Sequence, residues 1–190
     1  ATGMTLTVRR KSAIAKDIAL FELADPDGRA LPAFEAGAHI ALTTPNGLLR
    51  RYSLCNAPSD RQRYLIAVKR DEQGNGGSVS MVDQLTAGAT VAVSPPLNYF
   101  PLSRHATRYL LLAGGIGITP LLSMVHELRA RNADFELIYI ARAPESTAFL
   151  DQLADPDLAG RVQVHHSHGD PARSFKLAPV LAEHAAGTHL

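Results

Sequence analysis

The run Arg50-Arg51-Tyr52-Ser53-Leu54 contains side chains that could bind a cofactor. Two guanidinium groups, an aromatic ring and a hydroxyl follow one another in it. In an extended strand, Arg50 and Tyr52 face one side while Arg51 and Ser53 face the other. A flavin needs an aromatic or apolar surface along its ring, a donor for the ring edge and positive charge for its phosphate. Tyr52, Ser53 and Arg50 supply one of each, so the run predicts a flavin site.

A second run, Gly114-Gly115-Ile116-Gly117-Ile118-Thr119-Pro120, combines a glycine-rich turn with the expected start of a helix. Glycines let the backbone approach a pyrophosphate, and the first amides of a helix point at the anion with the helix dipole behind them. We expect the three glycines to form the turn, Thr119 to cap the helix and Pro120 to be its first residue. The run therefore predicts a pyridine-nucleotide site.

This second run is not the Rossmann fingerprint G-x-G-x-x-G, because no third glycine follows Gly115-Ile116-Gly117. The next predicted strand also lacks a terminal Asp or Glu that would hold a ribose hydroxyl, since it ends Ala141-Arg142. Arg142 could contact a ribose, a 2′-phosphate or only solvent. The ordinary alternative for the whole run is a glycine turn used for tight packing alone.

A third run, Gly76-Gly77-Ser78, stands ahead of another predicted helix and offers small residues, a hydroxyl and helix amides to an anion. Taken alone, each feature has a common explanation, because surface arginines are usually solvated and Gly-Gly pairs usually form turns. Together and in this order, the three runs favour an enzyme that passes a hydride between a pyridine nucleotide and a flavin.

The first half of the chain, which carries the predicted flavin residues, consists of short segments of alternating apolar and polar residues separated by turns. Its predicted strands are Leu6–Val8, Ile18–Leu23, His39–Leu42, Leu49–Leu54, Tyr64–Lys69 and Thr90–Val93. One helix, Ser78–Leu85, has apolar residues at helical spacing. Turns at Asp25-Pro26-Asp27-Gly28 and Pro45-Asn46-Gly47 supply fixed and positive φ angles. Six closely spaced strands predict an antiparallel β-barrel or sandwich.

The second half alternates strands with helices, which predicts a parallel sheet covered on both faces. The strands are Tyr109–Ala113, Phe135–Ile140 and Val162–His165, and the helices are Pro120–Arg131, Ser146–Leu153 and Leu177–His184. The change in periodicity places the boundary near Leu102–His105, giving domains over residues 4–103 and 104–190. Gly187 is a plausible helix end, and Thr188-His189-Leu190 begins a strand too short to pair. We therefore expect the nucleotide domain to be incomplete.

The composition argues against a disordered, a nucleic-acid-binding and a membrane-spanning protein. The chain is 46% hydrophobic and 19% charged with a net charge of +1, so it has neither the composition of disorder nor the basic surface of a nucleic-acid-binding protein. Glycines and Pro120 interrupt the longest uncharged stretch, Tyr109–Val125, which argues against a membrane span. A single cysteine, Cys55, favours a reducing cytoplasm and excludes a four-thiolate iron–sulfur cluster within these residues.

Three histidines, in His165-His166-Ser167-His168, could suggest a metal site. Adjacent side chains of a strand point apart, and no cysteine or carboxylate at ligand spacing accompanies them. We therefore predict that the chain has no metal site.

The sequence resembles the phthalate dioxygenase reductase and vanillate demethylase reductase branch of the ferredoxin–NADP reductase superfamily. The resemblance rests on Arg50-x-Tyr52-Ser53-Leu54, Val68-Lys69-Arg70-Asp71, Pro95-Pro96-Leu97-Asn98-Tyr99-Phe100-Pro101-Leu102 and the glycine runs, and it covers Leu6 to Leu190. It implies an FMN-binding Greek-key β-barrel, an NADH-binding α/β domain and a C-terminal [2Fe-2S] ferredoxin domain. The last is absent from this sequence, as is the family's Cys-Gly-Pro strand.

Carried over by position, the resemblance implies two sets of cofactor-binding residues. The FMN set is Arg50, Arg51, Tyr52, Ser53, Ala67, Val68, Lys69, Gly76, Gly77, Ser78 and Thr119. The NAD(P)H set is Gly114, Gly115, Gly117, Ile118, Pro120 and Arg142. Ser53 and Thr119 are the candidates for a catalytic role beside the reacting ring edge, where the protein supplies position and polarity rather than an acid or base.

The resemblance implies the reductase component of a multi-component aromatic-ring oxygenase or O-demethylase. Such a protein moves a hydride from NADH to FMN and then single electrons to a [2Fe-2S] centre and a Rieske-type oxygenase component. We expect a monomer that binds neither nucleic acid nor membrane. A FAD-dependent ferredoxin or flavodoxin–NADP reductase and a non-catalytic nucleotide-binding module are the alternatives, and the residues leave NADH against NADPH open.

Overall fold

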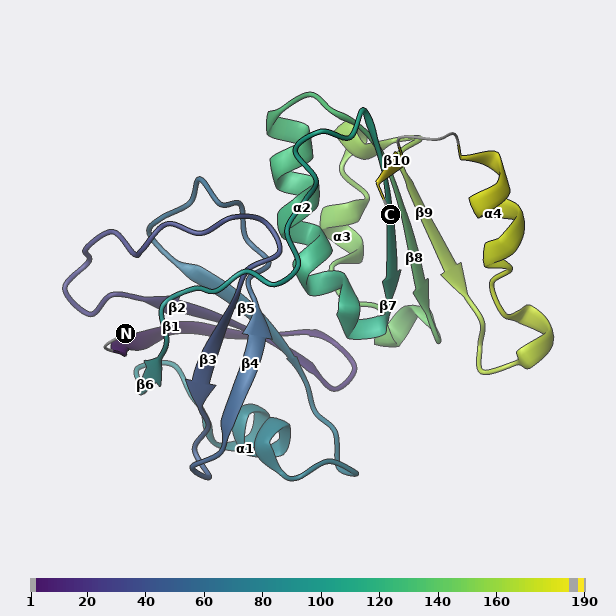
Figure 1. Cartoon of the computed structure of the whole chain (residues 1–190). Helices are drawn as coiled ribbons and strands as arrows, with labels where there is room; N and C mark the ends of the chain where they lie inside the picture. The colour runs from purple at the N-terminus through teal and green to yellow at the C-terminus, as the bar shows by residue number, and fades with distance from the viewer. Residues whose placement is uncertain (1–2, 185–187, 190) are drawn as a thin grey trace.

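The computed structural model describes residues 3–184, 188 and 189 of the chain and places them in two sheets (Figure 1). The strands of the first are β1 (Met4–Ala15), β2 (Ile18–Ala24), β3 (His39–Thr43), β4 (Leu49–Ser53), β5 (Tyr64–Lys69) and β6 (Thr90–Val93). They form an antiparallel sheet in the order β4-β3-β6-β1-β2-β5. Past β4, the Cys55 amide donates to the Leu65 carbonyl at 2.9 Å, which brings the two edges of the sheet together as a Greek-key barrel.

Alternation of apolar and polar residues explains this sheet, because alternate side chains point into one core. Phe21, Ile40, Leu42, Tyr64 and Ile66 are each fully buried there. Burial of one such side chain contributes about 1.5–3 kcal/mol. The helix α1 (Gly77–Gln84) closes one end of the barrel, as Figure 1 shows.

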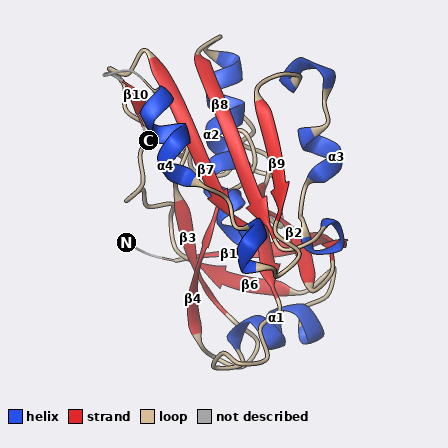
Figure 2. Cartoon of the chain, turned by 90° about the vertical axis from the view of Figure 1, so that its right-hand side faces the viewer, coloured by secondary structure: helices blue, strands red, loops and turns tan. Residues whose placement is uncertain are grey.

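The second sheet is parallel and has the order β10-β7-β8-β9, from β7 (Arg108–Gly114), β8 (Asp134–Ala141), β9 (Val162–His166) and β10 (Thr188–His189). The helices α2 (Ile118–Ala130) and α3 (Leu150–Leu153) cover the face turned toward the barrel, and α4 (Leu177–Glu183) lies on the other face (Figures 1 and 2). Helices on both faces agree with the prediction. The expected boundary lies in the connection between β6 and β7.

Three predicted elements differ from the structure. β1 continues to Ala15 rather than ending at Val8. Its polar second half keeps its backbone pairing with β2, and the register of this pairing shifts at two places. The segment predicted as one helix over Ser146–Leu153 is a 3-10 turn at Pro144–Ser146 and then only α3, since Phe149 between them has φ 65°. The expectation that the last strand cannot pair is wrong: β10 extends the existing edge of β7, with Thr188 opposite Arg108. Gly187 lies outside the described residues.

The barrel and the parallel-sheet domain share apolar contacts. Ala36 and Cys55 of the barrel are buried in the same cluster as Tyr109 and Leu122 of the second domain. At another point of the interface, the Lys16 amide donates to the Glu145 carbonyl at 2.7 Å. The two domains therefore pack against each other at more than one place.

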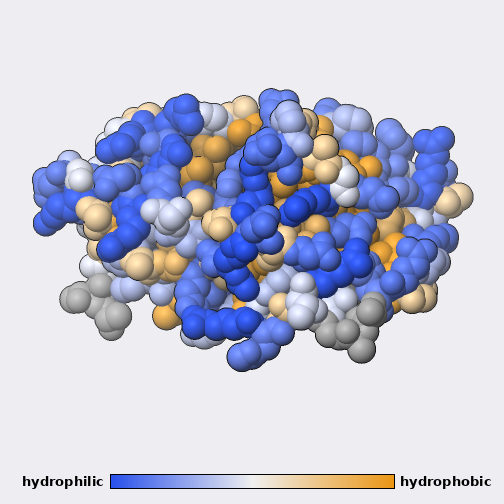
Figure 3. Space-filling view, turned by 90° about the horizontal axis from the view of Figure 1, so that it is seen from above, coloured by the Kyte–Doolittle hydropathy of each residue, from blue (hydrophilic) through white to orange (hydrophobic). Residues whose placement is uncertain are grey.

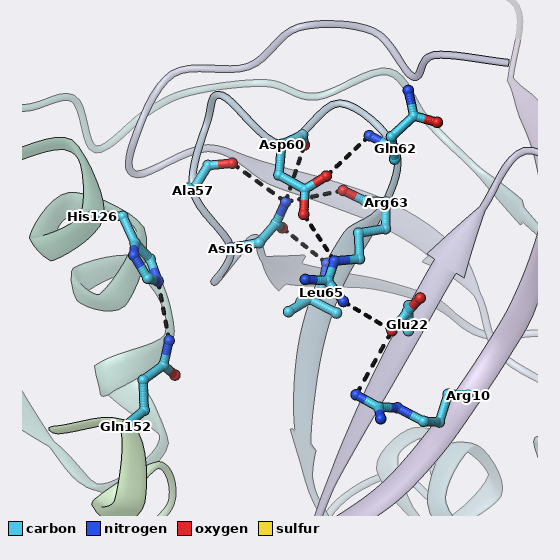
Figure 4. A network of polar contacts seen from close by, with 10 residues as sticks. All are labelled: Arg10, Glu22, Asn56, Ala57, Asp60, Gln62, Arg63, Leu65, His126 and Gln152. Atoms are coloured by element: carbon cyan, nitrogen blue, oxygen red, sulfur yellow. Dashed lines mark hydrogen bonds and ion pairs between the residues drawn. The ribbon is translucent and has the colours of Figure 1, made fainter. Parts of the chain in front are cut away.

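A polar network fixes the segment that follows β4 (Figure 4). Buried Asn56 accepts from the Leu65 amide at 2.9 Å and donates to the Arg63 carbonyl at 2.9 Å. Arg63 in turn donates to Asp60 at 2.8 Å and to Glu22 at 3.2 Å. This loop is thereby tied to β2 and β5, next to the second domain.

The surface seen from above is mostly polar, with apolar groups showing in separate areas between polar side chains (Figure 3). Within the described ranges, no helix is both long and apolar enough to cross a bilayer.

Candidate functional site

The predicted flavin strand is β4, and its pairing with β3 shows which way each side chain points. Tyr52 lies opposite Ile40, whose side chain is fully buried, and Tyr52 itself packs partly against the barrel core. Burial raises the pKa of the Tyr52 hydroxyl, and nearby Arg50 lowers it by a smaller amount. Tyr52 is therefore a neutral, half-buried aromatic surface, as a ring-binding residue should be.

Arg50 extends from β4 across the N-terminus of α1. A Cβ built on Gly77 would stand 3.0 Å from Arg50 Nε, so the guanidinium occupies the space that a side chain would need. In the described part of the chain, the guanidinium bonds only to the Leu49 carbonyl, at 2.9 Å. The positive charge next to Gly77 is thus not neutralised by any carboxylate of the described residues.

The N-terminus of α1 is open to an anion. Its N-cap is Gly76 with φ 81°, which has no side chain to cap the helix, and no acidic residue lies in the first turn. The first amides of such a helix attract negative charge. Ser78 Oγ accepts from the Asp71 amide at 3.1 Å, which holds the preceding loop in place. The structure therefore brings Arg50, Gly76, Gly77 and Ser78 together in one cradle that fits a phosphate.

The remaining predicted flavin residues lie at the end of β5. Ala67 and Val68 are buried, while Lys69 is exposed and has no ion pair with any described residue. The next residue, Arg70, is by contrast fully engaged by Asp83 and Glu72, which raise the pKa of its guanidinium. Lys69 is the one that remains available to an anion.

In the second domain the glycine turn is a 3-10 turn, η1 (Gly115–Gly117), between β7 and α2. A Cβ on Gly114, Gly115 or Gly117 would meet no atom within 4 Å, so tight packing is not what these glycines serve. The space above the turn is open to a ligand. The packing alternative for this motif is therefore contradicted.

Two details of the helix start were predicted wrongly. The N-cap of α2 is Gly117 rather than Thr119, and Pro120 is the third helical residue rather than the first. Thr119 is buried inside the first turn, where its hydroxyl donates to the Ile116 carbonyl at 3.1 Å. This hydrogen bond stabilises the glycine turn. It exists because η1 precedes the helix, and the Thr119-Pro120 pattern, which predicted a helix cap, does not indicate it.

The two motifs meet at the domain interface. Ile116 of η1 packs against a buried cluster that includes Ala67 of β5, and η1 lies next to β5. Ser53 and Pro120 line the same cavity of about 270 Å³, together with His39, Arg51 and aromatic residues of the connection, Tyr99 and Phe100. Ser53 is half-buried, and its hydroxyl has no partner among the described residues. Arg51 is on the outward face of β4, as alternation predicted, and not in the phosphate cradle.

Arg142 follows β8 and lies at the same edge of the parallel sheet as the glycine turn. Its guanidinium covers Gly169, where a Cβ would stand 3.1 Å from Arg142 Nε. Neighbouring His166 lies 2.9 Å from the Thr147 hydroxyl, and His165 contacts the Arg173 carbonyl at 2.6 Å. No described group of three His, Cys, Asp or Glu residues could hold a metal ion.

Residues 5–101 match the family model described as an oxidoreductase FAD-binding domain. The chain is 47% identical to phthalate dioxygenase reductase of Burkholderia cepacia over 98% of its length and 58% of the relative's. It is 44% identical to vanillate O-demethylase oxidoreductase of a Pseudomonas species, strain HR199, over 93% of its length and 56% of the relative's. The chain belongs to the phthalate dioxygenase reductase and vanillate demethylase reductase branch of the ferredoxin–NADP reductase superfamily.

A solved structure of phthalate dioxygenase reductase superposes on the chain with a TM-score of 0.96, at 47% identity and over 98% of the chain and 59% of that structure. Membership in this family confirms the predicted two-domain fold. The chain spans somewhat more than half the length of these relatives.

Two polar residues at the site, His39 and Asn46, have no predicted role in cofactor binding. His39 lines the cavity beside Ser53, and its Nε2 is buried without a described partner. Burial lowers the pKa of the His39 imidazole, with a smaller contribution from Arg51. Asn46 lies beside the phosphate cradle, within 3.4 Å of the Cβ position of Gly76. Asn46 was noticed only as part of a turn.

Proposed function

We propose that the chain is the flavin- and nucleotide-binding part of the reductase component of an aromatic-ring oxygenase or O-demethylase. It would bind FMN on the barrel and NADH on the parallel-sheet domain. One observation carries the proposal: the glycine turn of the second domain packs on β5 of the first, and Ser53 and Pro120 line one cavity. A nucleotide held by that turn would have its nicotinamide end next to a flavin held by β4 and β5.

A bound FMN would supply the capacity to take up a hydride from NADH and to release electrons singly, a chemistry that no side chain supplies. The residues of the chain provide binding, orientation and polarity. Arg50 and the N-terminus of α1 fit the phosphate, and Tyr52 offers the ring an aromatic surface. Ser53 offers a free hydroxyl near the reacting edge, while Thr119 braces the turn that positions the nucleotide.

The choice of FMN rather than FAD rests on the segment between β5 and α1. The chain passes from Lys69 at the end of β5 to the start of α1 at Gly77 by a short loop. FAD needs a further surface for its adenosine, and this loop leads directly into the helix instead. The family model that matches the barrel bears the name of FAD, so the bound flavin must be identified directly.

NADH is favoured over NADPH by the resemblance alone. Arg142 is exposed at the sheet edge and has no ion pair with a described residue, so it could accept either a ribose or a 2′-phosphate. A direct comparison of both nucleotides at equal concentration decides this question.

The proposed electron acceptor is a [2Fe-2S] centre outside this sequence, followed by a Rieske-type oxygenase component. The support comes from the relatives, which include a phthalate dioxygenase reductase and vanillate O-demethylase oxidoreductases. We further propose a monomer in the cytoplasm. The aromatic substrate would be selected by the oxygenase component, so these residues do not identify it.

The test begins with the flavin. The purified protein should be yellow, and its acid extract should contain FMN; an extract with FAD in place of FMN would contradict the cofactor assignment. Under anaerobic conditions NADH should bleach the flavin absorbance. With ferricyanide as acceptor, NADH should be oxidised catalytically. A protein that binds NADH but does neither would be a nucleotide-binding module rather than a reductase.

A further inference from the structure

The turn between β3 and β4 lies beside α1, as Figure 1 shows. Its residue Asn46 contacts two hydroxyl groups from different parts of the barrel. The Asn46 Oδ1 accepts from Thr44 Oγ1 at 2.6 Å and from Ser80 Oγ at 3.0 Å. Thr44 and Ser80 are both buried, and their hydroxyls also lie 2.9 Å from the Leu48 and Gly77 carbonyls, so this exposed side chain is anchored to two hydroxyls that are themselves held in place.

The donor end of the same amide then points toward the glycine pair. Asn46 Nδ2 lies 3.4 Å from the position that a Cβ on Gly76 would occupy. No acceptor in the described part of the chain lies within hydrogen-bonding distance of Nδ2. An amide nitrogen carries two donors, and this nitrogen lies next to Gly76, the N-cap of α1.

We infer that Asn46 is a further phosphate-binding residue, held by Thr44 and Ser80 so that its amide nitrogen donates to the phosphomonoester of the flavin. The inference rests on the proposed function, because it concerns the same cofactor. It adds a donor that reaches the cradle from the β3–β4 turn, beside the guanidinium of Arg50 from β4 and the amides of α1.

Three donors from three elements suit the three terminal oxygens of a phosphomonoester. Arg50 stands over Gly77 and Asn46 stands over Gly76, so the two side chains flank the helix N-terminus on adjacent residues. Because neither glycine has a side chain, Arg50 and Asn46 can approach the helix N-terminus closely. A neutral amide also places no negative charge there, whereas an aspartate at position 46 would repel a phosphate.

The experiment compares two ligands that differ only in the phosphate. Apo-protein, prepared by removing the flavin, is titrated with FMN and with riboflavin, and binding is followed by quenching of flavin fluorescence. Asn46→Ala should weaken FMN binding by roughly tenfold, the value of one good charge-assisted hydrogen bond, and leave riboflavin binding unchanged. Asn46→Asp should weaken FMN binding more than Asn46→Ala, because it keeps the acceptor for Thr44 and Ser80 but adds charge.

Gln73→Ala is the matched control, since it removes an exposed amide from the loop ahead of α1 that contacts no described group through its side chain. It should bind FMN as the unchanged protein does. Ser80→Ala should weaken FMN binding less than Asn46→Ala, because the amide loses one of its two supports. Urea unfolding curves confirm that each variant is folded.

The possible results separate the inference from the proposed function. An unchanged protein that binds neither FMN nor riboflavin would overturn the proposed function. Normal FMN binding by both Asn46 variants would overturn the inference alone. Equal weakening of FMN and riboflavin binding would also overturn it, because it would mean that Asn46 only shapes the turn.

Discussion

The guanidinium of Arg50 lies against Gly77, with its Nε 3.0 Å from where a glycine Cβ would be and its Cγ at 3.3 Å. The strand that carries the aromatic surface and the helix that carries the anion-binding amides are thereby joined at one point. Gly77 is buried and does not need a positive φ, so the close approach of Arg50 is its main reason to be glycine.

Gly77→Ala should therefore displace Arg50 while leaving the backbone intact. We expect FMN to bind roughly tenfold more weakly, since one charge-assisted contact is lost, and the midpoint of urea unfolding of the apo-protein to change little. Gly74→Ala is the control in the same loop, because its Cβ would meet only Asp71 at an ordinary 3.4 Å. Unchanged FMN affinity in Gly77→Ala would show that Arg50 is not a phosphate ligand.

Ser53→Ala should slow flavin reduction and leave the stability of the protein unchanged. The Ser53 hydroxyl has no partner among the described residues, so its removal leaves no buried group unsatisfied and should not alter the urea midpoint. If the hydroxyl donates to the flavin, anaerobic reduction by NADH, followed by stopped-flow absorbance, should slow by up to about a hundred- to a thousandfold, the effect of one lost donor to a developing charge.

Ser94→Ala is the matched control, because it should lower stability and leave the rate of flavin reduction unchanged. Its hydroxyl accepts from the Ala41 amide at 2.9 Å, so its loss should lower the free energy of unfolding by about 1 kcal/mol without slowing flavin reduction. A Ser53→Ala protein with normal reduction kinetics would remove Ser53 from the catalytic residues.

Much of the fold could be predicted because periodicity reports directly which face is buried. The strands β2 to β8 and the helix α2 follow patterns of two and 3.6 residues. β1 was predicted too short because Arg9, Arg10 and Lys11 break the apolar pattern, although backbone pairing with β2 continues beyond them. Strand length depends on the partner as well as on the strand's own residues.

The site was less accessible to prediction because its geometry depends on contacts between distant residues. Asn46 is positioned by Ser80, 34 residues further along the chain, and neither residue type nor spacing reveals that contact. Thr119 next to Pro120 has the pattern of a cap, yet η1 shifts the helix start two residues earlier. The motifs predict where the cofactors would bind, and only the structure shows which of these side chains have no other partner.

Cys55 allows a prediction about pH. Its thiol is buried and contacts the Leu65 carbonyl at 3.1 Å, and burial raises its pKa from 9.0 to about 12. The folded protein should therefore resist iodoacetamide at pH 8, and urea should expose the thiol to rapid labelling. Rapid labelling of the folded protein would contradict the buried position.

The same pKa shift has a defined effect on stability. Because the folded pKa is raised above the unfolded one, the unfolded state loses its thiol proton first as the pH rises. The contribution is complete below pH 9.0 and declines as the pH rises toward about 12. The free energy of unfolding should fall between about pH 9 and 12 more steeply for the unchanged protein than for Cys55→Ala, as measured by urea titration.

Removing the hydroxyl of Thr119 or of Ser123, both on α2, should have opposite effects on stability and on the reduction rate. The comparison tests whether Thr119 supports the glycine turn. Thr119→Val removes the bond to the Ile116 carbonyl at 3.1 Å, so it should cost about 1 kcal/mol of stability and slow flavin reduction by NADH. Ser123→Ala removes a fully buried Oγ with no described partner, so it should be neutral or slightly stabilising and leave the rate unchanged. Thr119→Ser, which keeps the hydroxyl, should recover most of the rate. If Thr119→Val is destabilised but reduces its flavin at the normal rate, Thr119 supports the helix and takes no part in positioning the nucleotide.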